Sequence, residues 1–174
     1  QRWLDESAQL AEKTLTFKYS DSNGDKSRKL SFSVFLGEYR TDILRVDARR
    51  VHPNKKDRQR ANREHQEVKH VYASAGIERL WEGPFLMPVD NDISSPFGNR
   101  RVFNGELKSY HNGLDFRSPV GTPVRAANSG IVRVAKNLFY SGNAVIIDHG
   151  TEIFSIYAHL SKVKVTAGQR VEKG

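Results

Sequence analysis

Two residues of this sequence, His111 and Asp115, are the best placed by type and spacing to do chemistry together. A neutral imidazole and a carboxylate are ordinary zinc ligands, and a catalytic zinc site has three protein ligands and one open position. A step of four residues returns a side chain to the same face of a strand, and roughly so in a helix. Gly113 lies between the two and Pro119 follows, so we expect an extended bend or a strand rather than a helix.

The same pair also has a purely structural interpretation, in which the histidine hydrogen-bonds a neighbouring carboxylate. On spacing alone this interpretation is the better one, because short motifs often occur by chance. The surrounding residues 94–126 are rich in Ser, Pro and Gly. Such residues predict a site built on loops and strand ends, which is where binding residues are often found.

Length and composition allow one domain or two small ones, since the chain has 174 residues with 37% hydrophobic and 28% charged side chains. The sequence contains no apolar run long enough for a transmembrane helix. It begins with Gln1 instead of Met, and we therefore expect a trimmed piece of something longer. It contains no cysteine, which excludes disulfides and thiolate metal sites.

The net charge of +8 is compatible with anionic partners such as nucleic acid, acidic lipid or cell-wall polymer. Residues 49–70 carry 8 basic and 3 acidic side chains, although such a run is usually a solvated face. A nucleic-acid-binding module is an alternative that rests on this basic segment. It has no recognised binding fold and few interleaved aromatic residues, so we expect no nucleic-acid partner.

The first half predicts a small β-rich domain over residues 1–80. Two alternating runs, 14–19 and 30–36, flank a turn at 21–25 and predict a β-hairpin. We further expect a short lead-in helix or an ordered lead-in without a helix, a third strand, and a charged helix that begins after an Asn54 N-cap and ends near Gly76. The lead-in helix falls in 1–13 and the third strand in 42–47.

The second half predicts a separate domain, residues 81–174, entered through a Pro- and Gly-containing linker at 81–92. Short runs rich in Val and Ile, separated by turns, predict an antiparallel sheet or sandwich. The predicted strands are 130–135, 143–149, 152–158 and 162–166. The expected fold class is thus mainly β: an antiparallel β-sheet or sandwich domain preceded by a small β-hairpin-plus-helix domain.

Taken in order, several motifs of the second half resemble the lysostaphin/LytM-type zinc metallopeptidases, which cleave peptide cross-bridges in bacterial peptidoglycan. The resemblance covers roughly residues 85–174, and the first half resembles more loosely the small β-rich domain that often precedes this peptidase in secreted Gram-negative members. The motifs are SSPFGNRR at 94–101, HNGLD at 111–115, PVGTPVRAANSGIV at 119–132, GNAVIIDHG at 142–150, YAHLSKV at 157–163 and VTAGQRVEKG at 165–174.

The resemblance implies a Zn²⁺ cofactor with His111 and Asp115 as the first two ligands, and a catalytic role for His159. In the family, the third ligand and a second catalytic histidine come from a later His-x-His motif, which this sequence does not contain. Strand alternation alone would place His159 on one face with Tyr157, as a core histidine. Arg100, Arg101, Asn104 and Tyr110 are weaker candidates for substrate contacts.

The resulting hypothesis is an exported zinc metalloendopeptidase of the periplasm or cell envelope that hydrolyses peptidoglycan stem peptides with a metal-activated water. The alternative, from another class, is a degenerate LytM-like domain that regulates other cell-wall hydrolases. The missing His-x-His motif favours the alternative, whereas the retained His111, Asp115 and His159 favour the enzyme. A further hypothesis is that the N-terminal domain covers the metal cleft and restrains activity.

Overall fold

The structure is a computed structural model that describes residues 11–35 and 37–174. Strands account for 39% of the chain and helices for 14%, which confirms the mainly β fold class. Contacts divide the chain into two compact units, residues 1–40 and 41–174, and each is described by itself.

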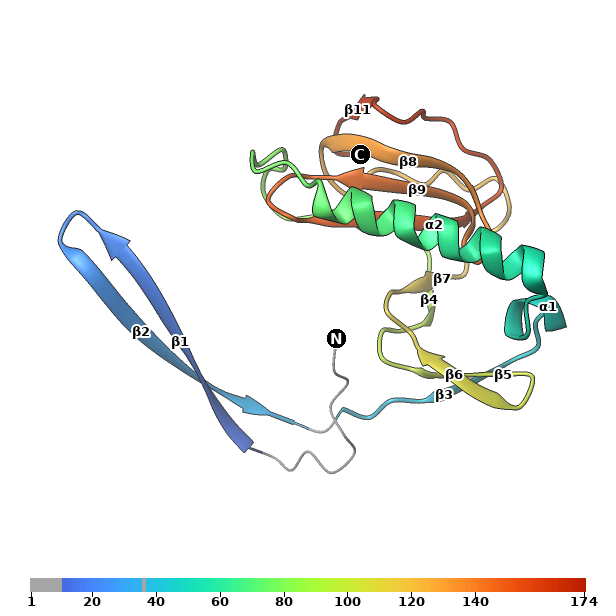
Figure 1. Cartoon of the computed structure of the whole chain (residues 1–174), viewed down its shortest axis with the longest axis horizontal. Helices are drawn as coiled ribbons and strands as arrows, with labels where there is room; N and C mark the ends of the chain where they lie inside the picture. Colours follow the sequence, from blue (N-terminus) through green and yellow to red (C-terminus); the bar gives the residue numbers. More distant parts are fainter. Residues whose placement is uncertain (1–10, 36) are drawn as a thin grey trace. The chain divides into compact units, whose positions relative to one another are not determined.

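The first unit contains one antiparallel hairpin of β1 (Ala11–Asp21) and β2 (Gly24–Val34), as predicted (Figure 1). A two-residue loop joins the strands, and Gly24 adopts a φ of +98° there, which suits a residue without a Cβ. Of the predicted lead-in helix, residues 1–10 lie outside the described residues. Residues 11–13 belong to β1, so the helix prediction is wrong for them.

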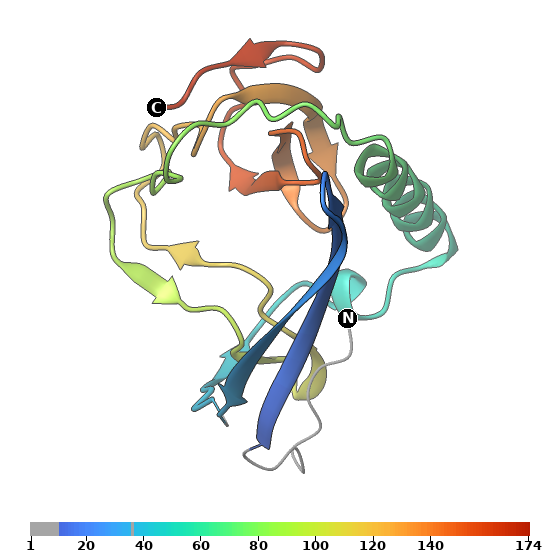
Figure 2. The same cartoon turned by 90° about the vertical axis from the view of Figure 1, so that its left-hand side faces the viewer.

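The second unit is built around a four-stranded antiparallel sheet in the order β10-β9-β8-β11 (Figures 1 and 2). The strands are β8 (Gly130–Leu138), β9 (Gly142–Asp148), β10 (Phe154–Leu160) and β11 (Arg170–Val171). Apolar side chains of β8 and β9 are buried in two clusters. One cluster contains Val132, Val145, Ile147 and Tyr157; the other contains Val134, Leu138, Ala144 and Ile146.

Helix α2 (Lys55–Ala73) covers the second of these clusters with Val68 and Val71. Its start is as predicted, since the Asn54 side chain accepts a hydrogen bond from the Asp57 amide at 2.9 Å. The Asp57 carboxylate accepts from Arg49 of the short helix α1 (Ala48–Val51). Helix α2 is therefore part of the second unit, where it is held by apolar contacts and by the ion pair between Asp57 and Arg49.

Strand β3 (Thr41–Leu44) also belongs to the second unit. It pairs in parallel with β5 (Arg100–Phe103), and β5 pairs with β6 (Glu106–Tyr110). The sequence located this strand correctly but assigned it to the N-terminal domain. The compact units consequently divide at residue 40, whereas the sequence placed the boundary near residue 80.

The segment expected to be a linker is fastened to the sheet. The Leu80 amide donates to the His149 carbonyl at 2.9 Å, and the Glu82 amide donates to the Asn128 side chain at 3.2 Å. These bonds give residues 80–82 a fixed place against the β8–β9 sheet, so this stretch does not behave as an independent connector.

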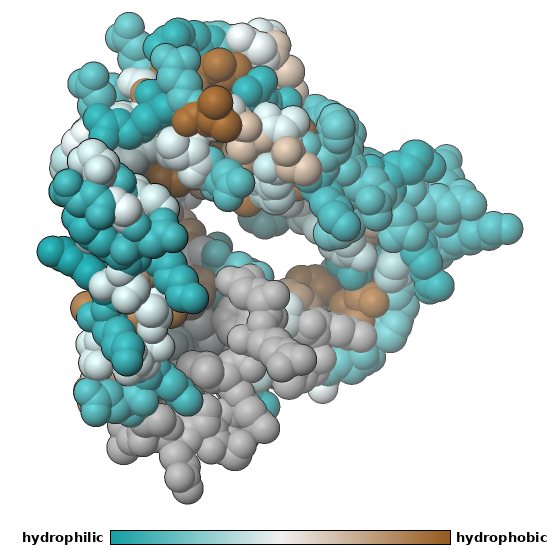
Figure 3. Space-filling model, turned by 60° about the vertical axis from the view of Figure 1, so that its left-hand side comes forward, coloured by the Kyte–Doolittle hydropathy of each residue, from teal (hydrophilic) through white to brown (hydrophobic). Residues whose placement is uncertain are grey.

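One predicted strand, 162–166, is wrong, because these residues have no ladder partner in the described chain. Val163 and Val165 nevertheless pack against the core, and this burial accounts for the alternating pattern that suggested a strand. On the face drawn in Figure 3, the coloured part of the surface is mostly hydrophilic with local apolar patches. In the described part of the chain, no helix is long and apolar enough to cross a membrane.

Candidate metal centre

The two predicted metal ligands lie together, with 3.2 Å between His111 Nε2 and Asp115 Oδ1. His111 follows β6 directly, and Asp115 opens the short strand β7 (Asp115–Phe116). The His111 amide donates to the Asn99 carbonyl at 2.8 Å, and the Gly98 amide donates to the His111 carbonyl at 2.8 Å. The chain between the two ligands is an extended bend, as Gly113 and Pro119 predicted.

A short antiparallel pair fixes Asp115 from the other side. Strand β4 (Ile93–Ser95) pairs with β7, and Ser95 is opposite Asp115 in the register. The Ser94 hydroxyl donates to the Asp115 carbonyl at 3.2 Å. The lead-in segment SSPFGNRR thus braces the backbone of both candidate ligands.

The second ring nitrogen of His111 is committed to protein partners. Nδ1 lies 3.0 Å from the Pro96 carbonyl oxygen and 3.1 Å from Ser95 Oγ, and the residue is buried. A carbonyl oxygen can only accept, so Nδ1 carries the proton that bonds it. In the neutral ring, Nε2 therefore presents a lone pair towards Asp115. Metal-binding histidines commonly use this arrangement, with the remote N–H given to a carbonyl.

The geometry of this pair fits two corners of a zinc site. Zinc binds nitrogen and oxygen at about 2.0–2.1 Å, and two ligands of a tetrahedral site are then roughly 3.3 Å apart. The other oxygen of Asp115 is paired with the Arg101 guanidinium. Across residues 11–35 and 37–174, no group of three His, Cys, Asp or Glu side chains could hold a metal ion. Within the described residues, the geometry brings together two candidate ligands, His111 and Asp115.

His159, the predicted catalytic histidine, is exposed on β10 in an unusual backbone conformation. Its φ is +57°, in the left-handed region that non-glycine residues rarely adopt. A bulge causes this: Tyr157 pairs with Val145, but Leu160 pairs with Asn143, so β10 has one extra residue. The structure gives no hydrogen bond between His159 and His111 or Asp115 within the described residues.

The bulge also corrects the alternation argument. Leu160, and not His159, follows Tyr157 onto the core cluster, so His159 is not a core histidine. Strained backbone of this kind is found preferentially at functional sites. The exposure and the strain are both compatible with a residue that meets substrate.

The other histidines have structural surroundings. His149, the last residue of the predicted strand 143–149, directly follows β9 and is fully buried; Nδ1 lies 2.7 Å from the Ser129 carbonyl and Nε2 2.7 Å from Ser155 Oγ. His52 contacts Glu106 at 2.9 Å, and the remaining two lie on the exposed side of α2. None of them joins the His111–Asp115 pair.

The weaker candidates for substrate contacts differ in their surroundings. Asn104 is a turn residue: its side chain both donates to and accepts from the Val46 backbone at 3.0 Å, and its φ is +51°. Arg101 is committed to Asp115, and Arg100 is half-buried beside it. Sequence reasoning did not single out Ser95 as a partner of His111 or Arg101 as a partner of Asp115. The SSPFGNRR motif contains both residues, and it was the only available signal for them.

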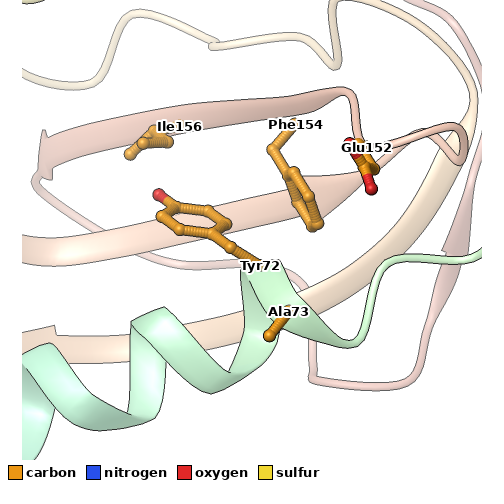
Figure 4. Close-up of a pocket in the computed structure, with 5 residues that line it drawn as sticks. All are labelled: Tyr72, Ala73, Glu152, Phe154 and Ile156. Atoms are coloured by element: carbon orange, nitrogen blue, oxygen red, sulfur yellow. The ribbon is translucent and has the colours of Figure 1, made fainter. Parts of the chain in front are cut away.

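A shallow pocket lies between the end of α2 and β10, with the Tyr72 ring beside Phe154 (Figure 4). The two rings form an edge-on contact with centroids 4.9 Å apart, and burial raises the pKa of Tyr72. None of the predicted site residues lines this pocket. Its lining residues are Tyr72, Ala73, Glu152, Phe154 and Ile156.

Comparison with known proteins identifies relatives of this chain. Residues 109–174 match the model of peptidase family M23. The peptidoglycan DD-endopeptidase ShyA of Vibrio cholerae is 43% identical over 90 residues, which is 50% of this chain and 21% of ShyA. The peptidoglycan DD-endopeptidase ShyB of the same organism is 31% identical over 173 residues, which is 95% of this chain and 39% of ShyB.

A crystal structure of an M23 peptidase from Pseudomonas aeruginosa superimposes with a TM-score of 0.68 and 28% identity. The match covers 95% of this chain and 60% of that chain. Residues 109–174 therefore belong to a LytM-type domain of peptidase family M23, and the lysostaphin/LytM resemblance is confirmed. The chain spans well under half the length of the two curated relatives described above.

Proposed function

We propose that this chain is part of a zinc metalloendopeptidase that hydrolyses peptide cross-links of bacterial peptidoglycan in the periplasm or cell envelope. The observation that carries the proposal is the His111–Asp115 pair, with 3.2 Å between Nε2 and a carboxylate oxygen while the other ring nitrogen lies against the Pro96 carbonyl. The names of the relatives, both peptidoglycan DD-endopeptidases, support the substrate class. Family M23 itself implies a metal cofactor.

The residues divide the work between binding and proton transfer. His111 and Asp115 would hold the ion. A bound zinc would lower the pKa of its water ligand to about 7 and polarise the scissile carbonyl. His159 is the proposed proton carrier, because an exposed imidazole can take a proton from a nucleophile and return it to the leaving amine near neutral pH. Arg101 holds Asp115 in place through its ion pair.

A second candidate function rests on one observation. The described residues contain only two of the three expected protein ligands. A LytM-like domain that lacks a complete ligand set would bind and regulate other cell-wall hydrolases without cleaving anything. The two functions differ in metal stoichiometry and in turnover, and both quantities can be measured.

The test combines zinc content with digestion of purified peptidoglycan. We expect His111→Ala and Asp115→Ala to lose both zinc and activity, whereas His159→Ala retains zinc and loses activity. His65→Ala is the matched control, because His65 is exposed on α2 far along the chain from the site. If the wild-type protein binds no zinc and releases no peptides, the proposal of an enzyme is refuted and the regulatory function remains.

A further inference from the structure

A row of three polar side chains runs from β3 to the candidate metal centre. Ser95 Oγ donates to Asp42 Oδ2 at 2.5 Å, and the same oxygen lies 3.1 Å from His111 Nδ1. Ser95 and His111 are buried, and Asp42 is partly buried. Asp42 lies outside the residues that match the peptidase family, and no sequence pattern singled it out.

The proton positions along this row follow from which of its atoms can donate a hydrogen bond and which can only accept one. A serine hydroxyl has one proton, and the short contact to a carboxylate, which is acceptor-only, uses it. Ser95 Oγ therefore turns a lone pair towards His111. Both neighbours of Nδ1, Ser95 Oγ and the Pro96 carbonyl, are then acceptors. The neutral ring is held with its proton on Nδ1, so Nε2 stays free to bind a metal ion.

Asp42 is itself fixed in place. It lies on β3, whose parallel pairing with β5 sets it opposite Arg101 in the register. Its second carboxylate oxygen accepts from the Asn99 side-chain amide at 3.0 Å, and Asn99 is buried. The two oxygens are thus aimed at different partners, and rotation of the carboxylate away from Ser95 would leave buried donors without acceptors.

We propose that Asp42 is a positioning residue of the metal centre, which acts through Ser95 to hold His111 in the Nδ1–H tautomer. The inference rests on the proposed function in one respect, since the tautomer matters only if Nε2 binds a metal. Hydrogen-bond partners of metal-binding histidines typically change metal affinity by about 10–100-fold. Asp42 would give the segment before the peptidase domain a direct part in building its site.

The first measurement is the tautomer of His111 in the full chain without metal, from the nitrogen chemical shifts of the ring at about pH 8, where an ordinary histidine is neutral. Wild-type protein is expected to show the Nδ1–H form, even though Asp115 Oδ1 lies 3.2 Å from Nε2 and favours a proton there. Asp42→Ala and Ser95→Ala are each expected to raise the Nε2–H population. Asp90→Ala is the control, because Asp90 is an exposed carboxylate in the same unit and should leave His111 unchanged.

The second measurement is zinc affinity by competition with a chelator. Asp42→Ala is expected to weaken binding about tenfold. In the Ser95→Ala background the same substitution should add little, because the connection is already broken. If Asp42→Ala does not fold, Ser95→Ala alone tests the tautomer.

The outcomes separate the inference from the function on which it rests. A wild-type His111 in the Nε2–H form, or a tautomer and affinity unmoved by Asp42→Ala, would overturn the positioning role while leaving the peptidase intact. If the wild-type protein does not bind zinc but the variants show the expected tautomer shifts, the proposed metal function is refuted. The effect of Asp42 on His111 through Ser95 would still stand.

Discussion

The two nitrogens of His111 differ in what surrounds them, and that difference decides what the residue can bind. Nδ1 faces a backbone carbonyl and a hydroxyl, whereas Nε2 faces the Asp115 carboxylate, so with the proton held on Nδ1 it is Nε2 that would meet a metal ion. The sequence predicted the residue and its partner Asp115 from spacing and family resemblance. It could not predict the tautomer, because Ser95 and Asp42 reach the ring from other parts of the chain.

The left-handed backbone of His159 leads to a prediction about stability. Glycine adopts a positive φ without the steric cost that a Cβ brings, which is about 1–2 kcal/mol. His159→Gly and His159→Ala both remove the imidazole, but only the alanine keeps the strain at φ +57°. We expect the glycine variant to be the more stable by about 1 kcal/mol in urea unfolding.

Equal activity losses in the two variants would show that the backbone conformation and the imidazole contribute separately. An alanine variant as stable as the glycine variant would mean that the bulge relaxes when the side chain is removed. Strand alternation predicted neither the bulge nor the exposure of His159, since one extra residue in β10 shifts every later position.

At the scale of elements, α2 is joined to the end of β8 by a partly buried carboxylate. Glu64 Oε2 accepts from the Phe139 amide at 2.6 Å, and its other oxygen pairs with Arg60. The Glu64 side chain is 16% exposed, whereas that of Glu67, which pairs with Lys136, is 48% exposed. Glu64→Ala should therefore lower the free energy of unfolding by about 1–3 kcal/mol. Glu67→Ala, the matched control, should cost under about 1 kcal/mol.

Chemical denaturation of both variants measures this difference, and similar losses would mean that the Phe139 amide finds water instead. The N-cap of α2 and its length followed from the sequence, because Asn54 and the charged periodicity are local signals. The docking of α2 did not follow. Val68 and Val71 pack against a core cluster and the Tyr72 ring contacts Phe154, and such a thin stripe does not identify its partner.

The Asp148 carboxylate at the end of β9 makes stability depend on pH. Burial by itself would raise its pKa, but bonds from the Gly150 amide, Arg133 and the Gly76 amide together hold that pKa below its ordinary value. The folded state then binds fewer protons than the unfolded state, in which the pKa is about 3.9. The stabilisation is complete well above pH 4 and is lost as the pH falls through the folded-state value.

Asp148→Asn should remove this part of the pH dependence. The stability difference between wild type and variant should be largest near neutral pH and should shrink below about pH 4. Urea unfolding at a series of pH values measures it. A difference that stays constant across that series would mean that the ionised carboxylate adds nothing beyond the shape of the side chain.

For the whole molecule, the division at residue 40 predicts where the chain can be cut. Residues 41–174 include β3, which pairs with β5, and α2, which covers a core cluster. A fragment of residues 41–174 should unfold cooperatively, whereas a fragment of residues 81–174 loses both elements and should be markedly less stable. Thermal unfolding of the two fragments is the measurement, and equal midpoints would restore the boundary near residue 80.

That boundary was hard to predict because its evidence is not local. Pro and Gly in residues 81–92 are typical of a linker, and nothing nearby in sequence shows that Leu80 and Glu82 bond to residues 149 and 128. The strands of the sheet were largely predicted, because Val- and Ile-rich runs between glycine turns are a local signal. Residues 162–166 carried the same signal, yet their side chains are buried without ladder pairing.

The bulge at His159 has a consequence beyond the site. In the described sheet β10 has a neighbour on one side only, so its free edge offers backbone groups to any passing strand. From Phe154 to Tyr157 the ladder is regular and Ile156 is 56% exposed, which suits edge-to-edge association. At His159 the extra residue interrupts the regular spacing of backbone donors and acceptors that an incoming strand would need. The bulge at His159, the proposed proton carrier, thus also limits how many residues of β10 could pair with a strand of another molecule.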